Sequence, residues 1–386
     1  MISNFLSPTK LYIGLNSIEK ISEIIEEQNA RKVYVVTDKG LQAAGVTIPL
    51  LAQLEQTGAE YIVFDGVEPD PTEMIIHNAF EKLQSFEADL IIGIGGGSSI
   101  DTAKAIGILA TNGGEISDYR GVEKVTKPIL PLVAIPTTAG TGSEVTTVTV
   151  LIDAVQKLKY SIGGKNVAAK WAIIDANLTL SVPPRVTAFT GIDALTHAIE
   201  AYTSKLAYPI TDALAKEAIT LIAESLRTAV YQGTNIEARE NMLMGSLLAG
   251  LAFSNAKLGL CHVLCNPLGA HYNIPHGLAN AILLPYVTAY NVPSQLEKYA
   301  EIASILGESV EGLTIREAAE RATLAIQRLN QDVNIPVTLA DVGVEESNLE
   351  RMVEECYTNP LVQINPRTAS KDDLHQIYKN ALNGGE

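Results

Sequence analysis

The stretch DLIIGIGGGSSIDTAK (89–104) joins an apolar run to a glycine cluster and then to the start of a helix. Gly95, Gly96 and Gly97 let the backbone approach a ligand closely, and one of the two serines that follow can cap the helix. The N–H groups at the start of that helix and the positive end of its dipole favour a pyrophosphate. The stretch therefore predicts a strand, a phosphate-binding loop and a helix.

This loop departs from the usual dinucleotide fingerprint. Ser98 stands where the last glycine of the fingerprint is expected, and no acidic residue ends a second strand about 20 residues later. The acidic residue lies upstream instead, because Asp38 ends the run KVYVVTD (32–38). There it can accept hydrogen bonds from a ribose diol and repel a 2′-phosphate, which favours NAD over NADP. The alternative is that Asp38 caps the next helix.

A third loop with similar chemistry follows another apolar run. It reads IPTTAGTGSEVT (135–146) and offers hydroxyls and backbone amides to the same ligand. The groups concerned belong to Thr137, Thr138, Gly140, Thr141 and Ser143.

Short apolar runs alternate with amphipathic segments as far as residue 181. The strand-like runs are 32–38, 60–66, 89–97 and 131–138, and the helix-like segments include 18–28, 48–57 and 72–86. Continuous apolar runs of this length are typical of parallel strands buried on both faces. The alternation predicts an α/β fold with a mostly parallel, Rossmann-like sheet covered by helices on both faces.

The pattern changes at the adjacent prolines of SVPPRVTAF (181–189). Beyond them, segments such as 210–231 and 313–331 carry apolar residues at helical spacing. We therefore expect a dinucleotide-binding α/β domain over 1–181 and an all-α, metal-binding and substrate domain over 182–386. The default ligand site is the cleft between two such domains.

Composition limits the classes of partner and compartment. The chain has 386 residues, 47% of them hydrophobic, and a formal net charge of −16, which argues against nucleic acids and anionic membranes as partners. Three cysteines fit a reducing compartment. No leader peptide and no apolar run long enough to span a membrane is evident in the sequence. We therefore expect a cytoplasmic protein without a membrane partner.

A second group of residues has the composition of a metal site. Asp193 and His197 are four residues apart in a predicted helix (190–204), so their side chains project from one face. By themselves they fit a buried ion pair or a capping contact better than a metal site. Together with His262 and His276 they provide three imidazoles and a carboxylate, a set that accepts Fe²⁺, Zn²⁺, Co²⁺ or Ni²⁺.

The segment LCHVLCNPLGAHYNIPHG (260–277) also contains side chains of less certain purpose. Cys261 and Cys265 lack the spacing of a structural zinc site, and we interpret them as small buried hydrophobes. His271 fits a substrate pocket, a partner of a metal ligand or a core position. Two further histidines, His77 and His375, stand alone in amphipathic segments and are interpreted as surface residues.

Five segments together resemble the iron-containing, group III alcohol dehydrogenases over nearly the whole chain. They are GGGSSIDTAK (95–104), IPTTAGTGSEVT (135–146), GIDALTHAIEAYTS (191–204), LAGLAFSNAKLGLCH (248–262) and PHGLANAILLP (275–285). The resemblance implies a dehydroquinate synthase-like architecture and a homodimer or larger homo-oligomer. It also implies an NAD(H)- and metal-dependent alcohol dehydrogenase or aldehyde reductase acting on a small alcohol, diol or aldehyde. Fe²⁺ is the metal expected from the family, with Zn²⁺ as the alternative.

Carried over residue by residue, the resemblance assigns the site. The metal ligands are Asp193, His197, His262 and His276, and the catalytic residues are His262, His276 and His271. The cofactor-binding residues are Asp38, Asp70, Gly96, Gly97, Ser98, Asp101, Thr137, Thr138, Thr141, Ser143 and Lys159. Asp70 stands where the family often has asparagine. Phe253 is expected to line the substrate pocket, although a plain core position fits it as well.

One departure from the family pattern bears on the proton. Many members have a histidine four residues after the third ligand, where this chain has Asn266, so a relay through that side chain is in doubt. His271 is a candidate replacement. Two alternatives to a dehydrogenase remain, an NAD- and metal-binding protein with lost or altered activity and a related cyclase or lyase of the same fold group. The cyclase would need a basic cluster for a substrate phosphate, which the helical half lacks around its metal motif. A further competing class, a related reductase that needs no metal, is disfavoured because all four ligand residues are present.

Overall fold

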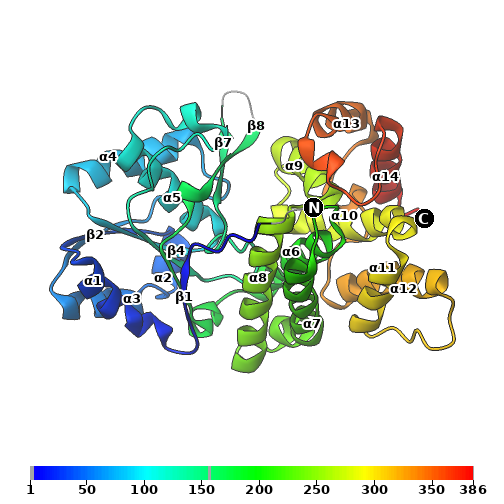
Figure 1. Ribbon diagram of the computed structural model, residues 1–386, viewed down its shortest axis with the longest axis horizontal. Coiled ribbons are helices and arrows are strands. Elements are labelled where there is room, and N and C mark those ends of the chain that lie inside the picture. Colours follow the sequence, from blue (N-terminus) through cyan, green and yellow to red (C-terminus); the bar gives the residue numbers. More distant parts are fainter. Residues whose placement is uncertain (1–3, 155–157, 386) are drawn as a thin grey trace. The chain divides into compact units, whose positions relative to one another are not determined.

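A computed structural model describes residues 4–154 and 158–385 of the chain (Figure 1). They form two compact units, which divide between Val182 and Pro183. Residues 4–6 belong with the helical unit, whereas the sequence division at 181 placed them in the α/β domain. Their backbone explains this, because the Leu6 N–H donates to Asn255 Oδ1 at 2.7 Å.

The α/β unit contains a six-stranded sheet in the order β1-β9-β6-β4-β2-β3, with every neighbouring pair parallel. Its strands are β1 (Lys10–Ile13), β2 (Lys32–Val36), β3 (Glu60–Phe64), β4 (Leu90–Gly95), β6 (Leu132–Pro136) and β9 (Trp171–Ile174). The predicted parallel sheet is confirmed, and β2, β3, β4 and β6 lie within the four strand-like runs. Strands β2, β4 and β6 are neighbours, so the loops that follow them emerge at one edge.

Helices cover both faces of this sheet, as predicted (Figure 1). On one face α1 (Ile21–Gln28) and α3 (Ile48–Thr57) bury a core with Trp171. On the other face α4 (Glu73–Phe86) and α5 (Gly97–Asn112) bury a second core. The remaining helical segments of the unit are α2 (Lys39–Ala43), η1 (Ser17–Lys20), η2 (Ile116–Tyr119), η3 (Lys165–Val167) and η4 (Ala176–Thr179).

A small second sheet, which sequence analysis did not predict, lies in the same unit. It has the order β5-β8-β7, with β5 (Gly121–Val122), β7 (Val148–Asp153) and β8 (Leu158–Gly163). Strands β7 and β8 are antiparallel, and β5 is parallel to β8. The sheet matters for the site because β8 carries Lys159.

The second unit is helical. Its elements are α6 (Pro184–Thr203), α7 (Pro209–Tyr231), α8 (Ile236–Ala256), α9 (Leu260–Tyr272), α10 (His276–Asn291), η5 (Val292–Ser294), α11 (Leu296–Ile305), α12 (Ile315–Asp332), η6 (Ala340–Val342), η7 (Glu346–Asn348), α13 (Leu349–Tyr357), η8 (Pro360–Gln363) and α14 (Lys371–Asn383). Helix starts follow local signals, such as Pro184 in the first turn of α6 and the reciprocal Thr314–Glu317 capping bonds of α12. Helix α6 is buried from Gly191 to Thr203. Polar side chains along that stretch therefore need partners inside the protein.

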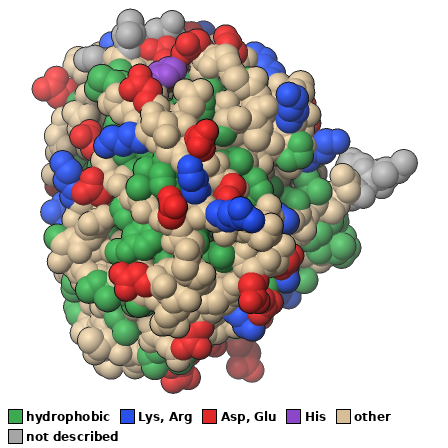
Figure 2. All heavy atoms as spheres, turned by 90° about the vertical axis from the view of Figure 1, so that its left-hand side faces the viewer, with side chains coloured by type: hydrophobic (Ala, Val, Ile, Leu, Met, Phe, Trp, Pro, Cys, Tyr) green, Lys and Arg blue, Asp and Glu red, His purple; other side chains and the backbone are tan. Residues whose placement is uncertain are grey.

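Two observations concern the surface and membrane contact. Figure 2 shows basic and acidic side chains intermixed over the visible face, without a continuous patch of either sign. Among the described residues, no helix by itself combines the length and apolar character needed to cross a bilayer. Helices α8 and α9 pass such a test only when taken as a pair, and they are bent by 105° at their junction.

Candidate metal centre and cofactor loops

Helix α6 supplies the first two candidate ligands. Asp193 and His197 lie one turn apart, and their residues are only 2% and 5% exposed. The residues around them in the helix are buried too, so α6 brings a carboxylate and an imidazole into an apolar interior. Burying such groups without partners is costly, which makes their neighbours informative.

The start of α10 lies directly against α6. A Cβ at Gly277 would lie 2.4 Å from the backbone oxygen of Phe189, so only glycine permits this approach. The close contact places His276, the first residue of α10, beside the carboxylate of α6. Its Nε2 is 3.9 Å from Asp193 Oδ1.

Helix α9 contributes His262 from its first turn. The imidazole is buried, and its Nε2 lies 3.7 Å from Asp193 Oδ1. Within the described residues this Nε2 has no hydrogen-bond partner. One ligand atom from each of Asp193, His262 and His276 falls within 4.8 Å of the others. A carboxylate and two imidazoles, one of them with an unpartnered buried nitrogen, fit a divalent transition metal.

The fourth predicted ligand lies beside this convergence. The ring of His197 stacks on His262 at 4.4 Å between centroids and on Phe253 at 4.5 Å. Its assignment as a ligand stays a prediction. Phe253, from α8, presents an aromatic face next to the candidate site.

The charges of the site favour a cation. Burial raises the pKa of Asp193, but His197, His276 and His262 outweigh it and hold the pKa well below its usual range. Burial lowers the pKa of His262, yet Glu200 and Asp193 outweigh that effect and raise it to about 9. The carboxylates of Asp193 and Glu200 therefore favour positive charge at this centre.

Sequence reasoning assigned no role at the centre to three of its neighbours. Asn280 donates to Asp193 Oδ1 at 2.7 Å and lies one turn after His276. Glu200 lies 2.6 Å from His262 Nδ1. Its position seven residues after Asp193 is a helical signal that could have found it.

Cys265 is the third such neighbour, and it corrects the interpretation of the cysteines as packing alone. All three cysteines are buried and free. The Cys265 thiol donates to the His262 carbonyl at 3.2 Å, and its sulfur is 3.3 Å from His276 Nδ1. It therefore contacts two of the candidate ligand residues.

The structure gives His271 a different neighbourhood. Its Nε2 lies 3.0 Å from both carboxylate oxygens of Glu355 on α13. Nine residues along a helix correspond to roughly 14 Å of rise and the opposite face from His262. His271 is absent from the converging group, and its role in catalysis stays a prediction without geometric support.

At the edge of the α/β sheet, the loops after β4 and β6 are in contact. The Thr137 N–H donates to the Gly95 carbonyl at 3.0 Å. A Cβ at Gly97 would lie 2.8 Å from Thr141 Cγ2, and one at Gly96 would lie 3.5 Å from Thr138 Oγ1. These glycines let α5 begin directly beside the loop 135–146, called the threonine loop below. No described side chain caps the start of α5.

Asp38 lies two residues after β2 at the same edge and caps α2, where it accepts a hydrogen bond from the Leu41 N–H at 3.0 Å. This is the helix cap considered as the alternative, and it leaves the ribose assignment a prediction. The buried Thr137 hydroxyl has no hydrogen-bond partner among the residues described. It is a polar group available to a ligand at this edge.

Three predicted cofactor residues from distant segments meet. Lys159 Nζ donates to Asp70 Oδ1 at 2.8 Å, and the Asp70 N–H donates to Ser98 Oγ at 3.3 Å. Asp70 has a φ of 53°, in the left-handed region. The hairpin β7–β8 thus brings a lysine to the start of α5.

Asp101 and Ser143 are engaged with the protein itself. The Ser143 hydroxyl donates to Asp101 Oδ1 at 2.6 Å, and the Val150 N–H donates to Asp101 Oδ2 at 3.0 Å. Beside them, the ammonium of Lys104 donates to the carbonyl of Thr146 at 2.9 Å. These residues hold the loop 135–146 in place, and sequence reasoning did not single out Lys104.

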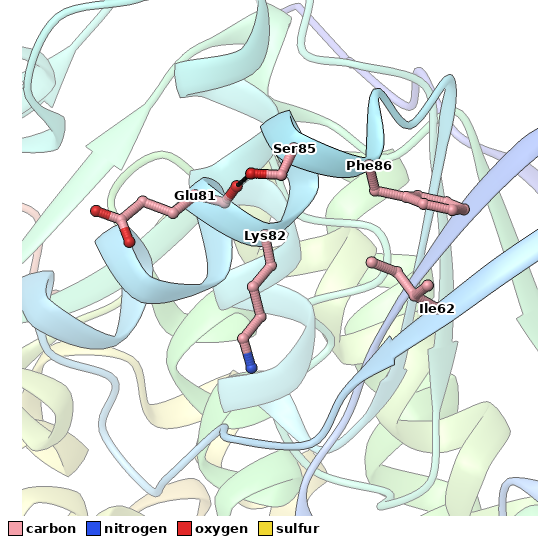
Figure 3. Close-up of a pocket in the computed structure, with 5 residues that line it drawn as sticks. All are labelled: Ile62, Glu81, Lys82, Ser85 and Phe86. Atoms are coloured by element: carbon pink, nitrogen blue, oxygen red, sulfur yellow. Dashed lines mark hydrogen bonds between the residues drawn. The ribbon is translucent and has the colours of Figure 1, made fainter.

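An open hollow of about 480 Å³ lies elsewhere on the α/β unit, lined by Ile62, Glu81, Lys82, Ser85 and Phe86 (Figure 3). Its lining comes mainly from the second half of α4, towards the end of that helix at Phe86. None of the predicted site residues lines it, so we do not assign it to the site.

Comparisons with known proteins match both units. Residues 8–176 match the family described as iron-containing alcohol dehydrogenase, and 187–382 match the C-terminal part of the Fe-containing alcohol dehydrogenase family. The chain is 43% identical over 381 residues to the 1,3-propanediol dehydrogenase of Klebsiella pneumoniae, covering 98% of each. It is 40% identical to the NAD-dependent methanol dehydrogenase of Bacillus methanolicus over 99% of this chain and 100% of that protein. A crystal structure of 1,3-propanediol oxidoreductase is similar at a TM-score of 0.97 and 42% identity, covering 99% and 100% of the two chains.

Proposed function

Since the chain belongs to the iron-containing alcohol dehydrogenase family and is an NAD-dependent alcohol dehydrogenase, we propose that it interconverts a small alcohol or diol and its aldehyde by direct hydride transfer. The observation that carries this proposal is the convergence of Asp193, His262 and His276 within 4.8 Å. This cluster fits a divalent metal, and the family to which the chain belongs is described as iron-containing.

Asp193, His262 and His276 hold the metal, with His197 as the fourth ligand. Support comes from the unpartnered Nε2 of His262 and from the buried charge that attracts a cation. Once bound, the metal supplies Lewis acidity that polarises a carbonyl or lowers the pKa of an alcohol. Asn280 keeps the Asp193 carboxylate oriented through its 2.7 Å hydrogen bond.

The loops after β2, β4 and β6 bind NAD. The nicotinamide of the cofactor supplies or accepts the hydride. Gly96, Gly97 and Ser98 let the diphosphate approach the start of α5. Asp38 disfavours a 2′-phosphate by charge, so NAD is preferred to NADP. Lys159, already bonded to Asp70, brings a positive charge to this region.

The substrate is a short alcohol, diol or aldehyde. This rests on the names of relatives that act on 1,3-propanediol and methanol, and on the aromatic face that Phe253 presents beside His197. The transferred proton leaves to water, because Asn266 cannot act as a general acid or base. Sparse cysteines suit the cytoplasm, and a homodimer or larger homo-oligomer is the assembly proposed.

The test is a panel of substrates offered to purified protein of measured metal content. With Fe²⁺ or Zn²⁺ bound, NADH absorbance should change with methanol, ethanol, propanediols or lactaldehyde. Asp193→Ala should lose both metal and turnover, whereas Asp372→Ala, in the exposed first turn of α14, should keep both. Absence of turnover across the panel with metal and NAD bound would instead support a binding protein that has lost its activity.

A further inference from the structure

The carboxylate of Glu200 bridges two elements of the helical unit. Glu200 lies on α6 and is 6% exposed. Its Oε2 is 2.6 Å from His262 Nδ1, and its Oε1 accepts from the Cys261 N–H at 2.6 Å. One oxygen therefore faces an imidazole, and the other meets the start of α9.

These contacts decide which nitrogen of His262 carries the proton. An ionised carboxylate only accepts hydrogen bonds, so the short contact requires a proton on Nδ1. The neutral imidazole then has its lone pair on Nε2. That atom is buried, unpartnered among the described residues, and 3.7 Å from Asp193 Oδ1. The lone pair is thus presented on the side of the ring where the other two candidate ligands converge.

We propose that Glu200 is a positioning residue that fixes the tautomer and orientation of His262, so that Nε2 binds the metal. The inference rests on the proposed ligand set of Asp193, His262 and His276. A carboxylate behind a ligand histidine fixes the ring and increases its basicity, and its loss typically costs 10–100-fold in metal affinity. Glu200 itself does not touch the metal or the substrate.

The fold holds Glu200 in this position from two sides. A Cβ at Gly259 would lie 3.1 Å from Glu200 Oε1 and 2.9 Å from Asn365 Oδ1, so the chain before α9 has room for the carboxylate only without a side chain there. The positive end of the α9 dipole further favours a negative charge at this point. Seven residues of α6, about two turns, place Glu200 on the same face as Asp193.

Glu200→Gln separates orientation from packing because the two side chains have the same shape. The amide of glutamine cannot satisfy both contacts. If its oxygen accepts from the Cys261 N–H, its NH₂ group faces His262 Nδ1 and forces the proton onto Nε2. If the amide is reversed, its NH₂ group meets the Cys261 N–H, and two donors face each other. A role in packing alone predicts no change in metal affinity.

The measurement is the affinity of metal-free protein for Zn²⁺ and Co²⁺, by competition with a chelator, together with the visible absorption of the Co²⁺ form. We expect Glu200→Gln to bind 10–100-fold more weakly with an altered Co²⁺ spectrum. Glu301→Gln is the matched control, because Glu301 also pairs with other side chains, Lys216 and Tyr202, but not with a candidate ligand. It should bind metal like the wild type. The thermal unfolding of each metal-free variant shows whether it is folded.

Glu200→Asp provides a second variant that keeps the charge but withdraws the carboxylate by one methylene, about 1.5 Å. It should also bind more weakly, and it decides the matter if the glutamine variant does not fold. Wild-type affinity in Glu200→Gln would overturn the inference, as would wild-type affinity in Glu200→Asp, since charge alone would then suffice. His262→Ala tests the ligand set separately, because retention of metal there refutes the proposed ligands whatever Glu200 does.

Discussion

At the scale of single residues, Lys104 has an unusual environment for a lysine. The side chain is completely buried, and its ammonium donates to the carbonyls of Ser143 at 2.6 Å, Thr146 at 2.9 Å and Val148 at 2.8 Å. Burial lowers the pKa of Lys104 to about 8, although Asp101 and Glu144 oppose this. The single ammonium thereby neutralises the mutual repulsion of three carbonyl dipoles in and just after the threonine loop.

Lys104→Met should disrupt that loop. Methionine fills much of the same volume but removes the ammonium that donates to the carbonyls of Ser143, Thr146 and Val148, and we expect a loss of about 2–5 kcal/mol in the free energy of unfolding. NADH should also bind more weakly, since Thr137 and Thr138 are in the same loop. Denaturant unfolding and fluorescence titration with NADH measure the two effects. Lys165→Met, at an exposed position, is the control. If the Lys104→Met variant is destabilised but binds NADH like the wild type, Lys104 does not influence cofactor binding through this loop.

Glu144 predicts a pH dependence of stability. It is 1% exposed, its Oε1 has no hydrogen-bond partner among the described residues, and burial raises its pKa to about 7. Between its unfolded pKa near 4.5 and about 7, the folded state holds a proton that the unfolded state has lost. Stability should therefore fall as pH rises through this window, by up to about 3 kcal/mol for this group. Glu144→Gln should remove that slope in urea unfolding series at several pH values; a slope equal to the wild type's would exclude Glu144 as its source.

At the scale of elements, the contact between α6 and α10 depends on Gly277. A Cβ there would lie 2.4 Å from the Phe189 oxygen, which is backbone and cannot move aside. Gly277→Ala should destabilise the protein by about 2–3 kcal/mol through overpacking and shift His276 away from Asp193, with weaker Zn²⁺ binding. Gly269→Ala, within α9, is the control because its Cβ would make only an ordinary 3.7 Å contact. It should be neutral or slightly stabilising. Equal effects of the two alanines would argue against a special contact at Gly277.

Elements also differ in how well their sequences predict them. The strands β2, β4 and β6 were predicted because continuous apolar runs bounded by glycine or threonine leave few alternatives. The hairpin β7–β8 was missed because β7 is only half-buried and lacks a continuous apolar run. The contact between Lys159 and Asp70 was therefore not predicted either, because β8 of this hairpin carries Lys159.

At the scale of the whole molecule, sequence motifs located the residues but not their relations. The ligand types and the three loop ends followed from local spacing. The bond from Asn280 to Asp193 joins residues 87 positions apart, and no local pattern encodes it. His271 is the opposite case, a residue close to two candidate ligands in the sequence but not in space. Its ring instead lies against the carboxylate of Glu355. Residues 4–6 likewise join the helical unit through contacts, such as that of Leu6 with Asn255, that no local pattern predicts.

The division into two units predicts that metal removal acts locally. The candidate ligands all lie in the helical unit, on α6, α9 and α10, whereas the loops proposed for NAD lie in the α/β unit. A bound metal stabilises the folded form by RT ln(1 + [L]/Kd), about 4 kcal/mol at a thousandfold excess over Kd. Where subglobal openings are measured by hydrogen exchange, this gain should fall on the elements that hold the metal.

Chelation should therefore increase exchange in α6, α9 and the start of α10 while leaving β2, β4 and β6 unchanged. NAD should do the reverse, slowing exchange at the start of α5 and in the threonine loop. A uniform increase across both units after chelation would mean that the chain opens as one cooperative body, and the ligands would then stabilise the enzyme globally.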